Sequence, residues 1–198
     1  MLSSGVTIGE RRARDRAARR RLIVATARKL AESEGWDAVT TRRLSSEIEY
    51  SQPVLYKHFS GMDAIAEAVA IDGFAELTDA LRAAGSGAAK PDEKFRRIAH
   101  AYIEFARDNP ALYDAMFTRA TTLRFAADDT PSQLSTAFAG IRSAVEAISD
   151  TSDVDTATEV VWAALHGLAT LSRSGRLRPD HEFERIELLA DQVTCTVR

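Results

Sequence analysis

The sequence predicts an all-α fold of about nine helices, in which an N-terminal three-helix domain precedes a larger helical bundle. Three observations lead to this prediction. Apolar residues recur every three to four positions along nearly the whole chain, no segment alternates strongly enough to indicate a strand, and short polar or glycine-containing stretches separate the periodic segments. With 198 residues, of which 45% are hydrophobic and 28% charged, the chain is large enough for one or two compact domains.

The first predicted helix covers about residues 17–34. Its apolar stripe includes Ile23, Ala27 and Leu30, which recur at the spacing of one helix face. Gly35 is suited to end this helix because glycine adopts a positive φ without strain.

Two short helices follow, each with its own start signal. Thr40 is a suitable N-cap for a helix over about residues 41–48, and Ser51 is a suitable N-cap for one over about residues 52–58. Pro53 falls in the first turn of the second helix, where its missing N–H removes no hydrogen bond. The pair has the dimensions of a helix-turn-helix, and a plain helical hairpin within an all-α core is the alternative.

The other helices are predicted from an apolar stripe on one face and a break at glycine, proline or a polar run. They lie over about residues 63–83, 95–108, 113–117, 134–148, 155–174 and 181–196. The breaks are the small-residue stretch 83–89, Asn109-Pro110, the polar segment 126–132, the turn at 150–153 and Gly175.

The net charge of −3 hides a division along the chain. Residues 1–60 hold 12 Lys and Arg against 7 Asp and Glu, whereas residues 61–198 hold 14 against 22. This distribution indicates a module that binds polyanions, joined to a part that does not. Nucleic acid or a membrane surface is the candidate partner.

Several classes of protein are not expected. The single cysteine, Cys195, cannot form an intramolecular disulfide, and it has no zinc-site spacing with the four histidines, so we expect no metal and no cofactor. No segment has the length of an apolar membrane span, and no signal peptide is evident. With a single cysteine, a reducing, cytoplasmic setting is expected. Because the chain lacks a catalytic motif, we do not expect an enzyme.

The stretch Thr40-Thr41-Arg42-Arg43-Leu44 and the stretch from Ser51 to Phe59 (SQPVLYKHF) resemble the DNA-binding domain of the TetR family of bacterial transcriptional regulators. The resemblance extends back through the first helix, with Gly35-Trp36 at the family's spacing. It implies three parts: a basic, flexible arm over residues 1–18, a helix-turn-helix domain over 19–63, and an effector-binding and dimerisation domain over 64–198.

The resemblance also implies which residues contact DNA. They are Thr40, Thr41, Arg42, Gln52, Pro53, Val54, Tyr56, Lys57 and His58. Arg42 suits a guanine edge and Gln52 an adenine edge, because each can form two hydrogen bonds there. Pro53 and Val54 suit a thymine methyl group, and the others suit phosphates.

Two positions depart from the family pattern. Glu49 occupies the turn between the two short helices, where the family usually has a glycine with positive φ, so we expect some backbone strain there. Met62 stands where the family commonly has a lysine that contacts a phosphate. Seven arginines between Arg11 and Arg21 could compensate by reaching a minor groove as a disordered arm, or they could form a solvated tail.

The segment Trp162 to Leu168 (WAALHGL) resembles the Trp-His-Gly (WHG) signature of one subclass of TetR-type C-terminal domains. The resemblance implies a pocket for a small apolar effector, although each candidate is alternatively a core residue. The candidates are Phe95, His100, Tyr102, Phe105, Tyr113, Met116, Phe117, Phe138, Trp162 and His166. For His166 we favour a hydrogen-bonded structural role.

The resemblance further implies a homodimer formed by the helices over about Asp155 to Ser174 and His181 to Thr196, in which Gly167 permits close approach. Such a dimer suits a palindromic double-stranded DNA operator. The expected function is a repressor that an effector releases. Activation, regulation without a ligand, and a basic adaptor protein are the alternatives.

Overall fold

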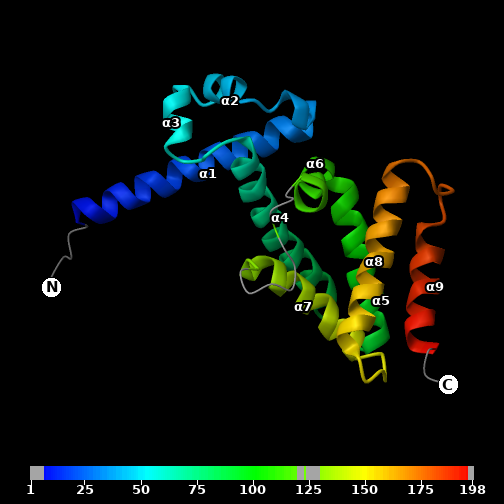
Figure 1. Cartoon of the computed structure of the whole chain (residues 1–198). Coiled ribbons are helices and arrows are strands. Elements are labelled where there is room, and N and C mark those ends of the chain that lie inside the picture. Colours follow the sequence, from blue (N-terminus) through cyan, green and yellow to red (C-terminus); the bar gives the residue numbers. More distant parts are fainter. Residues whose placement is uncertain (1–6, 120–122, 124–129, 196–198) are drawn as a thin grey trace. The chain divides into compact units, whose positions relative to one another are not determined.

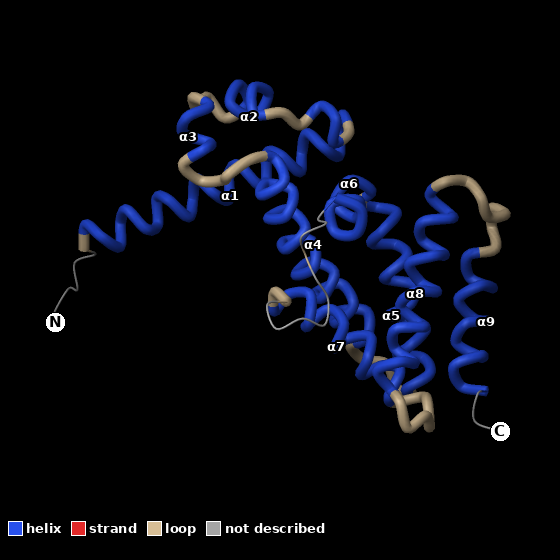
Figure 2. The backbone as a smooth tube through the Cα atoms, viewed as in Figure 1, coloured by secondary structure: helices blue, strands red, loops and turns tan. Residues whose placement is uncertain are grey.

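The computed structural model describes residues 7–119, 123 and 130–195. In this part of the chain the fold is all-α, as the sequence predicts, and no strand is present (Figure 2). The helices are α1 Ile8–Glu34, α2 Thr41–Glu47, α3 Gln52–Tyr56, α4 Met62–Gly85, α5 Pro91–Asp108, α6 Pro110–Asp114, α7 Ser132–Glu146, α8 Val154–Arg173 and α9 Glu182–Cys195 (Figure 1). A 3₁₀ turn, η1, covers Trp36–Ala38, and a π-helical turn, η2, covers Ala115–Arg119.

The chain divides into two compact units. The first comprises Met1–Ala70 and Ala111–Thr122, and the second comprises Ile71–Pro110 and Leu123–Arg198. This division differs from the boundary expected at residue 64. Helix α4 runs through residue 64 without a break, and the segment after Pro110 belongs to the first unit. Most of the predicted polar loop at 126–132 lies outside the described residues.

Helix α1 begins at Ile8, well before the start expected near residue 17. Its first turn is fixed by a capping box, in which the Thr7 hydroxyl accepts from the Glu10 N–H at 3.2 Å and the Glu10 carboxylate accepts from the Thr7 N–H at 2.8 Å. Arginine is also a good helix former. Residues 8–18 of the predicted flexible arm are therefore helical, and residues 1–6 lie outside the described part.

The first unit joins α1 to the distant segment that begins at Ala111. The Glu32 carboxylate accepts hydrogen bonds from the N–H groups of Ala111 at 3.0 Å and Leu112 at 2.9 Å. These are first-turn groups of α6, which have no acceptor within their own helix. The indole N–H of Trp36, which is buried, donates to the carbonyl of Ala111 at 2.8 Å. Glu32 thus caps α6 from another helix.

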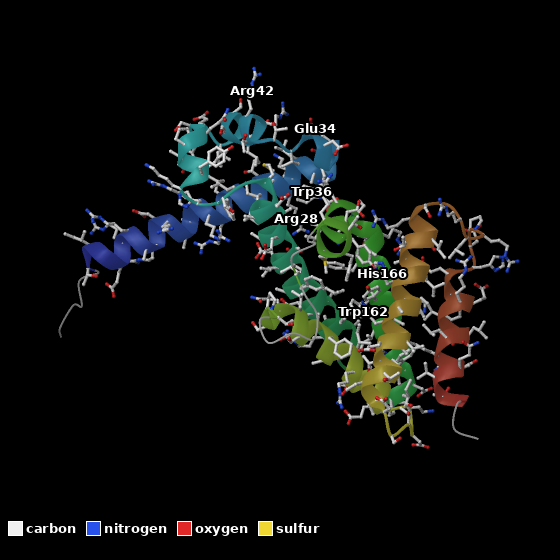
Figure 3. All side chains as sticks on the ribbon, in the orientation of Figure 1. Arg28, Glu34, Trp36, Arg42, Trp162 and His166 are labelled. Carbon is white, nitrogen blue, oxygen red and sulfur yellow. The ribbon has the colours of Figure 1, made fainter. Side chains whose placement is uncertain are left out.

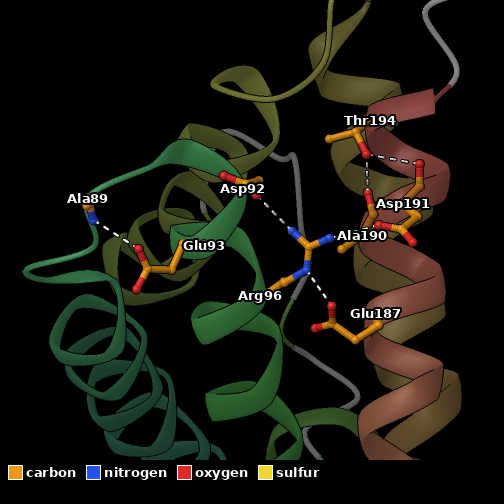
Figure 4. A network of polar contacts seen from close by, with 8 residues as sticks. All are labelled: Ala89, Asp92, Glu93, Arg96, Glu187, Ala190, Asp191 and Thr194. Atoms are coloured by element: carbon orange, nitrogen blue, oxygen red, sulfur yellow. Dashed lines mark hydrogen bonds and ion pairs between the residues drawn. The ribbon is translucent and has the colours of Figure 1, made fainter.

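The second unit is a bundle in which α5 packs against α7, α8 and α9. Phe95 and Tyr102 of α5 are fully buried, and Arg96 beside them holds α9. Its guanidinium donates to Glu187 and to Asp191 of α9, each at 2.8 Å, and to Asp92 at 3.2 Å (Figure 4). The hydrogen bond to Glu187 and the nearby carboxylates raise the pKa of Arg96 further.

Replacing Glu32 by alanine is expected to destabilise the first unit by about 1–3 kcal/mol, because two partly buried N–H groups lose their acceptor. Urea unfolding followed by circular dichroism measures the change. Glu34→Ala is the matched control, since it removes an exposed carboxylate from the same helix and breaks only a surface ion pair with Arg43. Equal losses in the two variants would contradict the capping role of Glu32.

Candidate nucleic-acid interface

The N-terminus of α2 presents polar groups to solvent. The hydroxyl of Thr40 accepts from the N–H of Arg43 at 3.1 Å, as predicted for the N-cap. Arg42 is exposed and points away from the rest of the unit, whereas Thr41 is half-buried (Figure 3). Arg43 bridges Glu34 and Glu47, each at 3.1 Å, and so secures α2 to the end of α1.

Helix α3 turns one narrow face inward. Leu55, at 2% exposure, is its buried residue, and Phe59 just beyond its end is also buried. The exposed residues are Gln52, Pro53, Tyr56 and Lys57, while Val54 and His58 are half-buried. Its outer face is therefore available to a partner, although His58 is partly covered. The helix ends at Tyr56, two residues before the predicted end.

Ser51 occupies the N-cap position of α3, but its hydroxyl makes no capping hydrogen bond to the helix. Its carbonyl accepts from the N–H of Val54 at 2.9 Å. Pro53 lies in the first turn, as predicted. Between α2 and α3, Glu49 has a φ of 55°, which is the strained conformation expected for a residue in the place of a glycine.

The end of α3 lies against α1. The Arg20 guanidinium donates to the carbonyl of His58 at 3.0 Å and lies 4.0 Å from the centre of the Phe59 ring. Burial, and then the charges of Arg16, Arg19, Arg20 and Lys57, lower the pKa of His58. The imidazole is therefore neutral at pH 7 and leaves the positive charge of this region to the arginines and Lys57.

The residues predicted to surround an effector fall in both units. Tyr113, Met116 and Phe117 belong to the first unit, where the Tyr113 and Phe117 rings lie 4.6 Å apart. The other seven belong to the second unit: Phe95, His100, Tyr102, Phe105, Phe138, Trp162 and His166. Sequence periodicity could not separate these groups, because α6 and η2 follow directly on α5.

Three aromatic side chains of the second unit form one cluster. The indole N–H of Trp162 donates to the Tyr102 hydroxyl at 3.1 Å, and the Phe138 ring meets the indole edge-on at 6.3 Å. His100 instead stacks on Phe183 of α9 at 5.5 Å. His166 is half-buried, and its pKa is lowered by burial and by the charge of Arg173.

A surface groove of about 490 Å³ in the second unit lies elsewhere, between α4, α5 and α7. Leu81 and Ile98 provide apolar surface, and Arg82 and Lys94 provide positive charge. None of the ten predicted effector residues lines it. Sequence analysis missed this groove because it depends on which faces of three separate helices converge.

Two family models match the chain. A model described as bacterial regulatory proteins, tetR family, matches residues 23–69, and one described as tetracyclin repressor-like, C-terminal domain, matches residues 95–195. A capped α2, a tight turn and an outward-facing α3 define a helix-turn-helix DNA-binding protein. The chain belongs to the TetR family and is a transcriptional regulator. The WHG subclass of its C-terminal domain stays a prediction.

Two relatives agree with this assignment, and a solved structure shares the fold. YobS, an uncharacterized HTH-type transcriptional regulator of Bacillus subtilis, is 35% identical over 48% of this chain and 49% of its own length. The chain thus spans about half of that relative. Rv0681 of Mycobacterium tuberculosis, also an uncharacterized HTH-type regulator, is 29% identical over 79% of this chain and 71% of its own. A protein of unknown function from Rhodococcus sp. RHA1 has a TM-score of 0.73 at 27% identity, covering 88% and 92% of the two chains.

No helix of the described residues is long and apolar enough to cross a membrane.

Replacing Glu49 by glycine is expected to stabilise the first unit by about 1 kcal/mol, because glycine adopts this φ without steric strain. Urea unfolding measures the gain. Glu49→Ala is the control: it removes the same carboxylate but keeps the Cβ atom, so its stability should stay near that of the unaltered protein. A gain of the same size in both variants would assign the effect to charge and refute the strain.

Proposed function

We propose that this regulator is a repressor, which binds a palindromic operator as a homodimer and is released by a small apolar effector. The observation that carries the proposal is the outward face of α3, where the side chains of Gln52, Tyr56 and Lys57 are exposed. Side chains that contribute so little to packing are available to a partner.

The proposed contacts divide into base readout and positioning. Arg42 would bind a guanine edge, Gln52 an adenine edge, and Pro53 with Val54 a thymine methyl group. The remaining predicted residues, Thr40, Thr41, Tyr56, Lys57 and His58, would hold phosphates. The first-turn N–H groups of α2 support this division, since a helix N-terminus favours an anion.

A partly exposed apolar stripe on α8 supports the proposed dimer. Val160, Ala164, Gly167 and Leu171 recur at intervals of four, three and four residues and so share one face. Val160 is 63% and Leu171 39% exposed, which is unusual for large aliphatic side chains. A Cβ atom on Gly167 would meet no atom within 4 Å beyond its chain neighbours and the nearby backbone of its own helix, so this position leaves space for a partner.

The aromatic cluster of Tyr102, Phe138 and Trp162 supports an effector site in the second unit. Its rings offer an apolar surface, and the Tyr102 hydroxyl offers one polar group. Release requires that the effector bind the arrangement unable to hold DNA better than the competent one. Helix α4 is suited to carry such a change, because it continues from the first unit into the second.

Two substitutions separate base readout from phosphate contact. Gln52→Ala should weaken binding to the preferred operator by about 1–3 kcal/mol and relax the sequence preference at one base pair. Lys57→Ala should weaken binding to all DNA sequences alike. It should also lower the slope of log affinity against log salt concentration by about one unit per protomer. The measurement is selection of duplexes from a random pool, followed by titrations at several salt concentrations.

Lys90→Ala removes an exposed charge of the second unit and is the control for net charge. It should leave the sequence preference and the salt dependence of DNA binding unchanged. A Gln52→Ala variant that selects the same operator with the same affinity would contradict the proposed readout. A protein that enriches no sequence at all would remove the operator hypothesis.

Leu171→Lys is expected to convert the proposed dimer to a monomer, because it places a charge in the apolar face through which α8 would meet its partner. Sedimentation equilibrium gives the mass, and circular dichroism should be unchanged because Leu171 is exposed. Ser135→Lys, on the exposed surface of α7, is the charge-matched control and should stay dimeric. A Leu171→Lys variant that stays dimeric would exclude this face of α8.

A further inference from the structure

The first part of α1 extends beyond the core of its unit. Every residue from 8 to 22 is exposed, and the first buried residue of the helix is Ile23. This stretch carries seven arginines against Glu10 and Asp15. Arginines placed three or four residues apart on a helix repel one another. The extension therefore concentrates positive charge without burying apolar surface, which is the property of a surface that binds a polyanion.

One row of these arginines continues the core face of the helix. Arg12, Arg16 and Arg19 precede Ile23 and Ala27 at the same intervals of three and four residues. The face that packs inside the first unit is thus apolar from Ile23 onward and cationic before it. As a result, these arginines are turned to the side on which α3 lies.

The row meets the end of α3 in a groove of about 580 Å³. We call it the α1–α3 groove; its lining residues are Arg12, Asp15, Arg16, Arg19, Lys57 and His58. The hydrogen bond from Arg20 to the His58 carbonyl holds its two walls together. Because His58 is neutral, four positive side chains face one carboxylate, so an anion is favoured there.

The length of the arginine row fits a nucleic-acid backbone. Arg19 follows Arg12 by seven positions, which is about 10 Å along a helix. One strand of duplex DNA carries a phosphate about every 3.4 Å of axial rise, so this row can meet more than one phosphate. Gln52, which is proposed to read a base, lies at the opposite end of α3 from Lys57. Phosphates in the groove would be different from those at the N-terminus of α2.

We propose that the α1–α3 groove holds DNA phosphates that lie outside the base pairs read by α3, with Arg12, Arg16, Arg19 and Lys57 as the ligands. This inference rests on the proposed operator binding and adds a second, sequence-independent contact to each protomer. A rigid helix thus takes the role that an irregular arm would otherwise have.

The test begins with an operator selected by the unaltered protein from a random pool. Arg16→Ala/Arg19→Ala is compared with Arg14→Ala/Arg21→Ala, which removes the same charge from residues that do not line the groove. The groove variant should bind at least about tenfold more weakly and lose about two units of salt slope per protomer. The control variant should change much less. All four arginines are exposed, so thermal unfolding should not distinguish the variants.

Neutral methylphosphonate linkages, placed one at a time along the operator, then locate the contact. At one or more positions the neutral linkage should weaken operator binding by the unaltered protein and by the control variant. It should not weaken binding by the groove variant, which already lacks the contact. These positions should lie outside the base pairs affected by Gln52→Ala.

Three outcomes would overturn the inference: equal losses in the two double variants, a groove variant with unchanged salt slope, or no linkage to which the groove variant has become insensitive. If the groove variant lost the unaltered protein's binding to anionic phosphatidylglycerol vesicles but bound DNA as before, the groove would be assigned to membranes instead. If the unaltered protein enriches no DNA sequence, the proposed operator binding itself has failed.

Discussion

The first unit depends on a carboxylate that caps a helix from outside. Glu32 satisfies two N–H groups at the start of α6, and Trp36 binds the carbonyl of Ala111 in the same place. Arg119 extends the contact, since it pairs with Asp37 at 3.1 Å. These bonds attach a segment far along the sequence to the end of α1 and to η1. The position of α1, and so of everything built on it, depends on this attachment.

With α1 fixed, local rules place the rest of the helix-turn-helix. Thr40 caps the start of α2. Leu44 lies on the buried face of α2, and Leu55 lies on the buried face of α3. Arg20 holds the end of α3 by donating to the His58 carbonyl. The strained φ of Glu49 is tolerated because the flanking contacts determine the course of the chain. Rigid support of this kind suits a surface that must match the fixed geometry of a duplex.

Local signals carried most of the information available from the sequence. Thr40 marks a helix end through its side-chain hydroxyl, and Gly35 and Pro53 do so through their backbone conformation, so the helix-turn-helix could be predicted with few errors in its bounds. The early start of α1 was missed because arginine-rich runs are equally typical of irregular arms, and only the Thr7–Glu10 capping box decides for a helix. The partner of Glu32 depends on tertiary packing, and no spacing in the sequence indicates it.

The two halves of the charge division have different physical roles. In the second unit, described arginines such as Arg96 and Arg142 are bound to carboxylates of the same unit, and this lowers their attraction for an external anion. In the first unit, Arg12, Arg16 and Arg19 line an open groove in which Asp15 provides the carboxylate. Since salt screens exposed charges beyond about 10 Å, position matters more than the net charge of the chain. A net charge of −3 is therefore compatible with a strongly cationic surface wherever the arginines are not already neutralised.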